Sequence, residues 1–394
     1  MIDMKLCLIH SLYYPYAKGG AEVVVEIILN ELLAQGHQVI LITLGRRKEI
    51  QRQGNLMIYR INPFNIFSFL DIDRRPIWLR FIWHPMDVFN ISSYFAVKKI
   101  LKQETPKAVL THNLKGLGYL IPKAIRRVGL KQIHTIHDVQ LSRPSGLIYF
   151  GQEKPFLILD KMYEKIVKRL FGNSDVVISP SRWLMGYYQA RGFFYESKKI
   201  ILPNPVIFKK VEKRDETMEQ GQGGKITLLY VGQWERHKGI LFLVNALKKI
   251  KLENWQILIV GNGGAKLNLE KLVGGDLRFK LVGWVEPEKL SDYFRQSDLT
   301  LVPSLCYENS PQVINESLVA NVPVVAADIG GVSEIVKDNY NGFTFAPGNE
   351  KNLIEVLEYF LSHPQFISDL KRNCFVSVRD YSVGHYIKKL LNLI

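Results

Sequence analysis

The side chains best suited to chemistry are concentrated between residues 303 and 316. An apolar run ends there, a loop carries Glu308, and a helical pattern begins at Pro311. Proline suits the first helical turn, and Ser310 before it can cap the helix. The free N–H groups at a helix N-terminus attract an anion. This combination suits a nucleoside diphosphate sugar, with amides on the phosphates and the carboxylates of Glu308 and Glu316 on the sugar and ribose hydroxyls.

Either acid taken alone would be interpreted as an ordinary surface residue, and only the surrounding pattern favours a site. Glu308 is the predicted catalytic member of the group. The donor-binding residues predicted beside it are Asn309, Ser310, Pro311, Gln312 and Glu316.

A second concentration, residues 230–239, follows the first apolar run in the second half of the chain. Gly232 allows a tight turn, and Arg236 and Lys238 stand directly before a helical pattern. Two cations there can neutralise a diphosphate leaving group without a metal ion, because Arg and Lys stabilise phosphoryl charge as Mg²⁺ does. A charge run before a helix is often merely solvated, but the position of Lys238 beside Gly239 favours the phosphate role.

Glycine turns after two later apolar runs are weaker signals. Gly261 and Gly263 form the first, and any tight turn between a strand and a helix could look the same. Gly330 and Gly331 form the second. The two turns support each other modestly, and we take Gly261 and Gly263, together with Gly232, as donor-binding candidates.

Gly19 and Gly20 open a helical pattern after the first apolar run of the chain. Their N–H groups could contact an anion or a sugar, and a simple turn fits the spacing equally well. His112 and His137 each follow a further apolar run, and a histidine at a strand's carboxyl end is a candidate hydrogen-bond partner or proton carrier. His137 is the predicted catalytic one, whereas the alternation within its strand makes His134 structural.

A possible metal site is the D-x-D pattern of Asp71 and Asp73, because paired carboxylates can hold a divalent ion. This pair lies among aromatic residues and before Arg74 and Arg75, with no strand ahead of it. The sequence therefore predicts no metal site. It also predicts no cofactor, since the nucleotide sugar would be a co-substrate.

Both halves of the chain alternate between buried strands and helices, and these elements must position the residues above. Continuous apolar strands with helices between them predict parallel sheets covered on both faces. We expect two Rossmann-like, doubly wound domains of the α/β class facing across a cleft at the carboxyl ends of their strands. The predicted strands are 6–9, 39–42, 108–111, 132–136, 175–179, 226–231, 256–260, 279–282, 299–302 and 323–326, and the clearest helices are 22–33, 240–249, 289–295 and 312–319.

The segment Pro203-Asn204-Pro205 marks the predicted domain boundary, since two prolines cannot continue a helix or a central strand. A polar stretch from Lys209 to Gly224 after it predicts a linker or a long surface loop. The expected domains are therefore 1–205 and 206–380. A last helix within 381–394 is a candidate to pack back toward the first domain.

The net charge of +15 belongs almost wholly to one half of the chain. Residues 1–205 contain 29 Lys and Arg against 15 Asp and Glu, while residues 206–394 contain 23 against 22. This excess suggests an anionic partner, such as a membrane surface, a phosphorylated acceptor or nucleic acid, although a merely soluble basic surface would give the same count. Cys7, Cys306 and Cys374 have neither disulfide nor zinc spacing, which indicates buried free thiols in a reducing cytoplasm.

Aromatic and basic residues are interleaved between Pro63 and Lys102. Basic groups are drawn to anionic headgroups and aromatic groups can enter the membrane interface, though the same aromatic residues could instead fill a core. No apolar run is long enough to span a bilayer. We therefore expect a cytoplasmic protein in peripheral contact with the anionic inner face of the membrane. The interleaved residues are Phe64, Phe67, Phe69, Trp78, Arg80, Phe81, Trp83, Phe89, Tyr94, Phe95, Lys98 and Lys99.

Taken together, these motifs resemble the family 4 glycosyltransferases, which are retaining enzymes of GT-B fold that use nucleotide sugars. The resemblance runs from Gly19-Gly20-Ala21-Glu22 to Gly342-Phe343, nearly the whole chain. The family's two glutamates, its cleft histidine and its phosphate lysine fall on Glu308, Glu316, His137 and Lys238. Its Pro-Val strand, double glycine and following glutamate fall on Pro323-Val324, Gly330-Gly331 and Glu334.

The resemblance implies that the second domain binds the donor and the first receives the acceptor. Glu308 would contact the donor sugar, Glu316 the ribose, and amides near Ser310 the phosphate. Family members usually carry Arg where this sequence has Gln233, and Arg236 could supply that charge instead. Together with the membrane features, this predicts a hexosyltransferase acting on a glycan or lipid-linked acceptor in cell-envelope polysaccharide or glycoconjugate synthesis.

Two other functions are weighed against transfer. A nucleotide-sugar epimerase can share the two-domain fold, and its product would be a changed sugar still on its nucleotide. A non-catalytic basic scaffold would fit the charge. Because no recognised nucleic-acid motif accompanies that charge, we predict no nucleic-acid partner.

Overall fold

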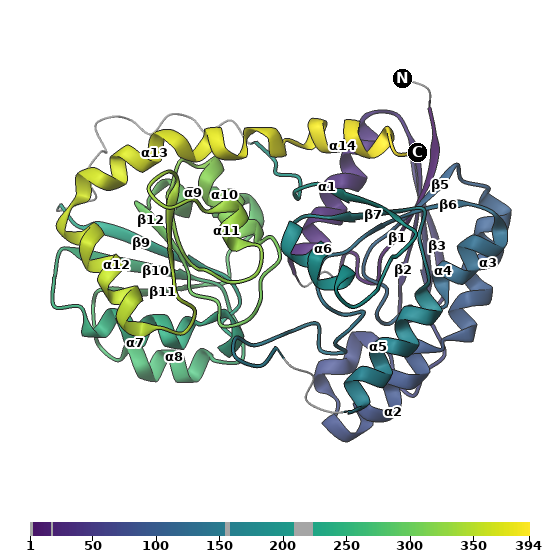
Figure 1. The fold of residues 1–394 in the computed structure, drawn as a ribbon, viewed down its shortest axis with the longest axis horizontal. Helices are drawn as coiled ribbons and strands as arrows, with labels where there is room; N and C mark the ends of the chain where they lie inside the picture. The colour runs from purple at the N-terminus through teal and green to yellow at the C-terminus, as the bar shows by residue number, and fades with distance from the viewer. Residues whose placement is uncertain (1–2, 17–18, 154–157, 209–223) are drawn as a thin grey trace. The chain divides into compact units, whose positions relative to one another are not determined.

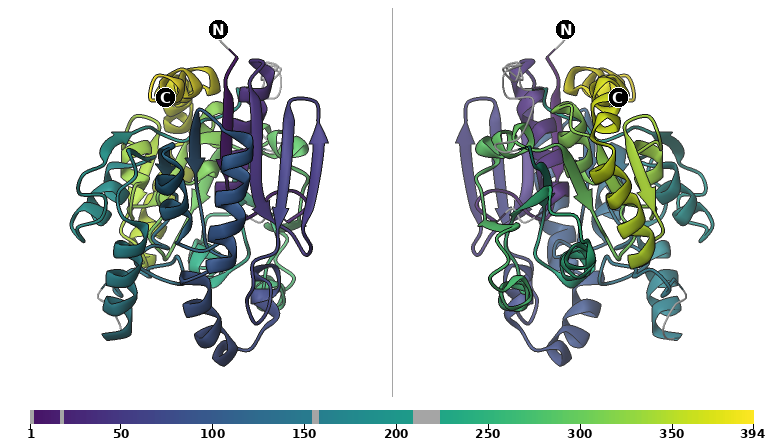
Figure 2. Two further views of the ribbon diagram at one scale, coloured as in Figure 1. Left: turned by 90° about the vertical axis from the view of Figure 1, so that its right-hand side faces the viewer. Right: turned by 90° about the vertical axis from the view of Figure 1, so that its left-hand side faces the viewer.

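The computed structural model describes residues 3–16, 19–153, 158–208 and 224–394. Each half of the chain is built around a parallel or mostly parallel sheet with helices on its faces (Figures 1 and 2). The first compact unit comprises Met1–Leu147, Lys154–Pro205 and Val383–Ile394, and the second comprises Ile148–Glu153 and Val206–Ser382.

The chain passes from the first unit to the second after Pro205, at the end of the Pro-Asn-Pro segment. Two departures from contiguous domains are a short stretch near residue 150, which belongs to the second unit, and the final helix, which belongs to the first. Lys18 and the predicted loop from Lys209 onward, apart from its last residue, lie outside the described residues.

The sheet of the first unit has the strand order β3-β4-β2-β1-β5-β6-β7-β8. Neighbours are parallel except β3 and β4, which pair antiparallel. The strands are β1 (Lys5–Ile9), β2 (Gln38–Leu44), β3 (Glu49–Gln53), β4 (Leu56–Ile61), β5 (Ala108–Thr111), β6 (Lys131–Thr135), β7 (Val176–Ser179) and β8 (Lys198–Ile201). The helices are α1 (Gly20–Ala34), the 3-10 turn η1 (Phe69–Arg74), α2 (Ile77–Val88), α3 (Ile91–Glu104), α4 (Ile121–Val128), α5 (Ile158–Phe171), α6 (Arg182–Gln189) and α14 (Val383–Leu391).

The sheet of the second unit is parallel throughout, in the order β11-β10-β9-β12-β13-β14. Its strands are β9 (Ile226–Val231), β10 (Trp255–Val260), β11 (Phe279–Gly283), β12 (Leu299–Val302), β13 (Val324–Ala327) and β14 (Gly342–Phe345). The helices and turns are η3 (Arg236–Lys238), α7 (Ile240–Lys249), α8 (Lys266–Val273), η4 (Pro287–Lys289), α9 (Leu290–Arg295), α10 (Gln312–Val319), α11 (Val332–Ile335), α12 (Glu350–Ser362), α13 (Pro364–Val378) and η5 (Arg379–Tyr381).

Each sheet has one place where the strand order reverses. In the first unit the chain winds outward from β1 through β2 and then returns to the other side of β1 at β5. In the second unit it winds from β9 to β11 and returns beside β9 at β12. Open α/β sheets bind ligands at the carboxyl ends of the strands beside such a reversal. The segments that follow β1, β5, β9 and β12 are therefore the places where a site is expected.

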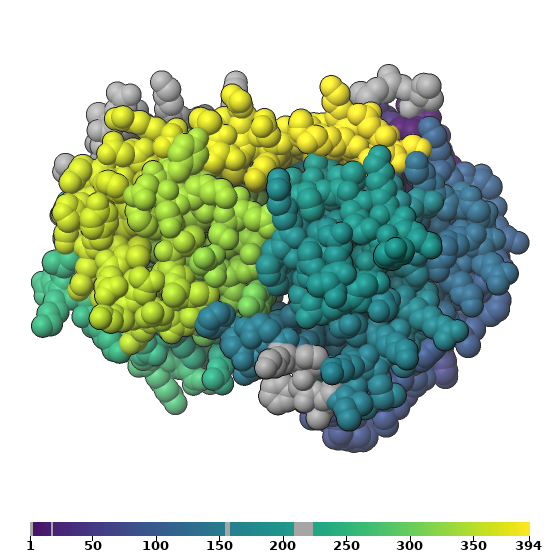
Figure 3. All heavy atoms as spheres, in the orientation of Figure 1, coloured from purple at the N-terminus to yellow at the C-terminus, as the bar shows by residue number. Residues whose placement is uncertain are grey.

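The last helix, α14, completes the core of the first unit. Tyr386, Ile387 and Leu390 are buried in one hydrophobic cluster with Val25 and Ile28 of α1. Figures 1 and 3 show this yellow end of the chain lying against the body of the first unit. The buried residues recur at helical spacing, which explains the amphipathic pattern of this last segment. The segment is distant in sequence from the rest of the unit that it packs on.

The predicted strands and helices lie within one or two residues of the observed ones, and the helix predicted at 289–295 is α9, preceded by the short turn η4. The antiparallel β3–β4 pair and the edge strands β8 and β14 were missed. Strand β3 is almost entirely exposed and polar, so it has no apolar run that could have indicated a strand. The three cysteines are buried and free, as predicted.

Candidate active site

In the second unit, Lys238 and Glu308 form an ion pair at the reversal of strand order. Lys238 ends η3 after β9, and Glu308 lies in the loop after β12. Lys238 Nζ is 2.6 Å from Glu308 Oε1, and Ser304 Oγ donates to the same oxygen over 2.9 Å. The side chains of the pair are 30% and 13% exposed, so a ligand can still reach them. Two residues predicted separately from the sequence are thus in direct contact.

The pair is charged at neutral pH. Burial alone would lower the pKa of Lys238, but the charge of Glu308 and the hydrogen bond to it raise that pKa above its ordinary value. Burial alone would raise the pKa of Glu308, but the ammonium group and the hydrogen bonds to the carboxylate lower it. Glu308 Oε2 accepts no hydrogen bond from any described residue. Because an ammonium group has three donors, the pair retains both donor and acceptor capacity for a ligand.

Close backbone packing fixes the two charged groups. The Gly331 N–H donates to the Glu308 carbonyl over 2.8 Å, and a Cβ on Gly330, whose φ is +69°, would lie 2.0 Å from the same oxygen. Gly239, directly after Lys238, has φ +74°, and a Cβ there would lie 1.8 Å from the Pro303 carbonyl oxygen. Only glycine allows these approaches, so both loops are held tightly against neighbouring backbone.

The turns after β9 and β10 pack on each other beyond the sheet. The Trp234 N–H donates to the Asn262 carbonyl over 2.9 Å. A Cβ on Gly261 would lie 1.9 Å from the Gly232 carbonyl oxygen, and one on Gly263 would lie 2.5 Å from that of Trp234. This packing alone explains why positions 261 and 263 require glycine. The role of Gly261 and Gly263 in donor binding therefore stays a prediction.

Helix α10 begins after the proline, not at it. Its N-cap is Pro311, with extended backbone and no side-chain cap. The prediction that Ser310 caps the helix with Pro311 in the first turn is therefore wrong by one position. The fixed φ of proline suits the extended entry as well as the helix, so the sequence pattern did not distinguish the two. Gln312 opens the helix and Glu316 lies about one turn further along, half-buried.

In the first unit, the turn at Gly19 and Gly20 is anchored by a carboxylate. The Gly19 N–H donates to Glu22 Oε2 over 2.7 Å, and Gly20 is the first residue of α1. Glu22 Oε1 lies 3.4 Å from Nε2 of His10, the residue that follows β1. Burial would raise the pKa of Glu22, but His10 and the backbone hydrogen bonds lower it. An ionised, half-buried side chain thus holds the exposed glycine turn at the reversal of this sheet.

His112 and His137 follow the neighbouring strands β5 and β6. His112 Nδ1 is 2.9 Å from His137 Nε2. Burial, with His10 nearby, lowers the pKa of His137 to about 3, and burial lowers the pKa of His112 well below its ordinary value. Both rings are therefore neutral at physiological pH, and His137 can exchange hydrogen bonds but not act as a cation. His134 contacts Thr111 Oγ1 over 3.0 Å inside the sheet, which fits its predicted structural role.

The sequence matches two family models that together span most of the chain. Residues 18–209 match the model described as Glycosyltransferase Family 4. Residues 212–374 match the model described as Glycosyl transferases group 1. The chain belongs to the family 4 glycosyltransferases.

Relatives of this glycosyltransferase are distant in sequence. An uncharacterized 42.6 kDa protein in the cps region of Klebsiella pneumoniae is 25% identical over 343 residues, which are 84% of this chain and 87% of that protein. The lipopolysaccharide 1,2-N-acetylglucosaminetransferase of Salmonella typhimurium is 26% identical over 203 residues, 47% of this chain and 52% of its own length.

Solved structures share the fold along the whole chain. Sucrose-phosphate synthase from Thermosynechococcus elongatus is 20% identical, with 99% of this chain and 98% of that chain covered and a TM-score of 0.78. Anabaena HepE, solved in complex with UDP-glucose, is 15% identical, with 99% and 98% covered and a TM-score of 0.71. The glycosyltransferase therefore has the GT-B fold that the sequence predicted.

The position where family members usually carry arginine is Gln233 in this glycosyltransferase. Its side chain is exposed in the turn after β9, and its carbonyl accepts a hydrogen bond from Tyr230 over 2.8 Å. Arg236, three residues later, is also exposed, and its side chain makes no hydrogen bond or ion pair with any described residue. Arg236 is therefore available to an anion, and its replacement of the usual arginine stays a prediction.

One contact of the site was not predicted. The segment Ile148–Glu153 lies along the loop that leads to Glu308, with Tyr149 and Cys306 in an antiparallel bridge. The Tyr307 N–H donates to the first residue of the segment over 2.8 Å. Pairing between segments so distant in the chain leaves no periodicity in either of them, so the sequence carried no signal for it.

The D-x-D pattern of this glycosyltransferase is engaged elsewhere. Arg46 donates to both carboxylate oxygens of Asp71, over 2.9 and 3.1 Å, and this lowers the pKa of Asp71. Asp71 and Asp73 both lie in η1 of the first unit. Within the described ranges, no group of three or more His, Cys, Asp or Glu side chains could hold a metal ion.

We expect transfer activity to survive EDTA, because we predict that Lys238 and Arg236 neutralise the leaving group in place of a metal ion. The double variant Asp71→Ala, Asp73→Ala should likewise keep the activity of the wild type. Initial rates with and without chelator decide the question. Loss of activity in EDTA that is restored by Mn²⁺ or Mg²⁺ would contradict this prediction.

Proposed function

We propose that this glycosyltransferase moves a sugar from a nucleoside diphosphate sugar to a glycan or lipid-linked acceptor of the cell envelope, retaining the anomeric configuration and using no metal ion. The observation that carries the proposal is the Lys238–Glu308 ion pair at the reversal of strand order in the second unit. A cation and an ionised carboxylate held together there match the two parts of the donor, which are an anionic diphosphate and a sugar rich in hydroxyl groups.

Each charged group has capacity left for the donor. Lys238 has two further N–H donors for phosphate oxygens, and Arg236 has no partner among the described residues. The open Oε2 of Glu308 can accept from a sugar hydroxyl. Glu316, further along α10, is proposed to hold the ribose, and the N–H groups of Asn309, Ser310 and Gln312 are proposed to hold phosphate. In the first unit, the exposed turn at Gly19 and Gly20 is a further candidate for a phosphate or sugar contact.

The reaction breaks the anomeric C–O bond, which leaves positive charge on the sugar ring and negative charge on the diphosphate. Lys238 and Arg236 would stabilise the leaving diphosphate more strongly as its charge develops, which lowers the barrier. In a retaining transfer, the acceptor hydroxyl attacks from the face that the diphosphate leaves, and a diphosphate oxygen takes its proton. The products are a glycoside and a nucleoside diphosphate. Neutral His137 would contribute a hydrogen bond and no charge.

The comparisons support the choice of donor and acceptor. The Anabaena structure contains UDP-glucose, so uridine nucleotides are the first donors to test. The Salmonella relative is named as a lipopolysaccharide sugar transferase, which makes an envelope glycan the first acceptor class to test.

A panel of UDP-, GDP- and ADP-sugars tests the proposal. The true donor should raise Tm, because a ligand at 100 times its Kd stabilises the folded state by about 2.7 kcal/mol. Nucleoside diphosphate should then be released only when an acceptor is present, and the anomeric configuration of the product reports retention. A changed sugar still attached to its nucleotide would indicate an epimerase. No stabilisation by any nucleotide sugar would contradict the proposal.

We also propose that the first unit contacts an anionic membrane at the inner face of the cytoplasmic membrane. Ile77, Trp78 and Phe81 on α2 are 72%, 61% and 68% exposed, and their spacing places them on one face of the helix. Arg74 and Arg75 precede that face. Exposed apolar groups beside cations match the interface of an anionic bilayer. No helix of the described residues is long and apolar enough to cross a bilayer.

The structure divides the aromatic residues of this region into two groups. Trp83 is buried, its Nε1 donates to the Phe67 carbonyl over 2.9 Å, and the rings of Phe67 and Phe69 stack on it. These three fill space inside the unit, as the alternative interpretation had it. Other members of the region stay exposed. They include Phe64, Trp78, Phe81, Phe89 and Phe95.

A Trp78→Ser, Phe81→Ser variant should bind phosphatidylglycerol vesicles about 100-fold more weakly at low salt, since two large apolar side chains no longer enter the interface. Vesicle sedimentation measures this, and high salt should weaken the wild type by screening its cations. A Leu267→Ser, Leu277→Ser variant is the matched control, because it removes two exposed apolar side chains from the second unit. If wild type remains in the supernatant equally with neutral and anionic vesicles, a soluble acceptor is favoured.

A further inference from the structure

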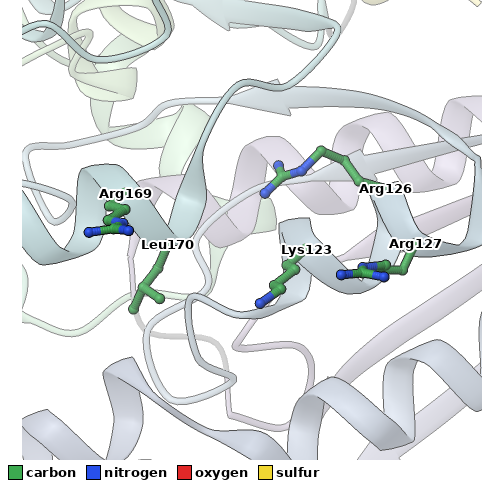
Figure 4. Close-up of a pocket in the computed structure, with 5 residues that line it drawn as sticks. All are labelled: Lys123, Arg126, Arg127, Arg169 and Leu170. Carbon is green, nitrogen blue, oxygen red and sulfur yellow. The ribbon is translucent and has the colours of Figure 1, made fainter.

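Four cationic side chains of the first unit gather around one hollow between α4 and α5. The hollow has a volume of about 490 Å³ and is lined by Lys123, Arg126, Arg127, Arg169 and Leu170. Figure 4 shows Lys123 and Arg126 extending from α4 toward the residues of α5. No acidic side chain lines it.

The hollow and the site residues of the first unit lie at opposite edges of the first sheet. Arg127 lies near the end of α4, just before β6 begins, and Arg169 lies near the end of α5, before β7 begins. The hollow is therefore at the amino-terminal edge of the sheet. Gly19, Gly20 and His137 lie at the opposite, carboxyl-terminal edge. A ligand in the hollow would be separate from any ligand held at Gly19, Gly20 or His137.

Helix electrostatics alone do not explain this charge. Arginines in the last turn of α4 complement its dipole, but Lys123 stands in the first turn, where a cation is unfavourable. Lys123 is also three and four residues from Arg126 and Arg127, and like charges at those spacings destabilise a helix. Helix α4 contains no acidic residue. Lys123, Arg127 and Arg169 form no ion pair with any described residue.

The fourth cation, Arg126, is part of the wall of the hollow and is held by hydrogen bonds. Arg126 Nη1 donates to the carbonyl oxygens of Phe171 and Asn173, over 2.8 and 3.2 Å. Between them, Gly172 has φ +67°, and a Cβ there would lie 3.0 Å from Arg126 Nη2. The chain after α5 is thus wrapped around this guanidinium. The hollow is shaped before any ligand arrives, with three cations left to face it.

We propose that this hollow is a binding site for a phosphate group that carries more than one negative charge. Arginine and lysine together suit phosphate, because guanidinium binds two oxygens at once and ammonium adds a mobile point charge. The phosphate belongs either to a soluble phosphorylated molecule or to a lipid headgroup. The site does not depend on the donor chemistry proposed above.

The test compares four proteins, which are the wild type, a hollow variant, a β3 variant and Lys238→Ala. The hollow variant, Lys123→Ser, Arg127→Ser, Arg169→Ser, removes the three cations that form no ion pair with any described residue. Arg126 is kept because its hydrogen bonds hold the chain after α5. The Arg47→Ser, Lys48→Ser, Arg52→Ser variant removes the same charge from exposed positions in and before β3. Tm is followed with increasing inorganic phosphate, against chloride at equal ionic strength. Lys238→Ala protein should have the half-saturating phosphate concentration of the wild type, although its Tm without phosphate is lower, which excludes the donor site as the source of the effect.

We expect phosphate to stabilise the wild type and the β3 variant, and the half-saturating phosphate concentration to rise at least about tenfold in the hollow variant. Sedimentation with phosphatidylcholine vesicles containing phosphatidic acid then identifies the source. If the hollow variant loses vesicle binding and the β3 variant does not, the ligand is a lipid headgroup. If the hollow variant binds vesicles as well as the β3 variant does, the ligand is a soluble phosphate compound. If the hollow and β3 variants respond alike to both phosphate and vesicles, the site is overturned, while the transferase proposal is untouched.

Discussion

A Lys238→Ala variant is expected to lose about 10²–10³-fold in kcat/KM for sugar transfer, the usual effect of removing one preorganised group that stabilises developing negative charge. Lys238 holds its charge because Glu308 raises its pKa against the effect of burial, and its side chain is 30% exposed, so a ligand can reach it. Glu308→Gln should lose a comparable factor, since the amide keeps the shape but removes the ionised acceptor. Steady-state kinetics with the identified donor and acceptor measure both losses.

The control for this pair is a second lysine–glutamate pair of the same unit. Lys249 at the end of α7 pairs with Glu350 at the start of α12, and neither lies in the loop after β9 or the loop after β12. Lys249→Ala should therefore keep wild-type kcat/KM. Thermal melting accompanies each measurement, because Lys238→Ala leaves a largely buried carboxylate without its partner and should lower Tm as well. A folded Lys238→Ala or Glu308→Gln protein with near-normal kcat/KM would remove that residue from the mechanism.

Most of the central part of the fold could be predicted because its buried parallel strands are continuous apolar runs, although β4, which is buried and parallel to β2, was missed. Strands such as β1, β5 and β9 are continuous apolar runs, since helices cover both of their faces. Polar or exposed edge strands lack that signal, which is why β3 and β8 were missed. The same reasoning explains the site. Site residues could be predicted where they lie in the loop just after an apolar run, as Lys238 and Glu308 do.

Contacts between distant segments could not be predicted. Lys238 and Glu308 are 70 positions apart, and nothing in either motif shows that they form one ion pair. The packing of Ile148–Glu153 on the loop before Glu308 has no local pattern at all. The hydrogen bond from Gly19 to Glu22 could have been predicted, because a glutamate three residues after an N-cap position indicates a capping box. The cationic hollow was hidden within the general excess of charge in the first half.

A Gly330→Ala variant should damage stability and activity together. At φ +69° an alanine is strained, and its Cβ would lie 2.0 Å from the carbonyl oxygen of Glu308. The combined strain and displacement should cost roughly 3 kcal/mol, or about 10 °C in Tm for a unit of this size. Because the displaced backbone is that of Glu308 itself, its carboxylate should move away from Lys238, and kcat should fall by more than tenfold even at temperatures where the protein remains folded.

Gly348→Ala separates this displacement from backbone strain alone. Gly348 has the same φ of +69°, but the nearest atom to its Cβ would be a Leu305 methyl carbon at 3.9 Å, an ordinary contact. This variant should lose only about 1 kcal/mol, roughly 3 °C, and keep wild-type kcat. The difference between the two variants then reports the close approach of Gly330 to Glu308. Equal kcat values for the two folded variants would show that the position of Glu308 does not depend on that approach, and that the loop after β13 has no part in placing the carboxylate.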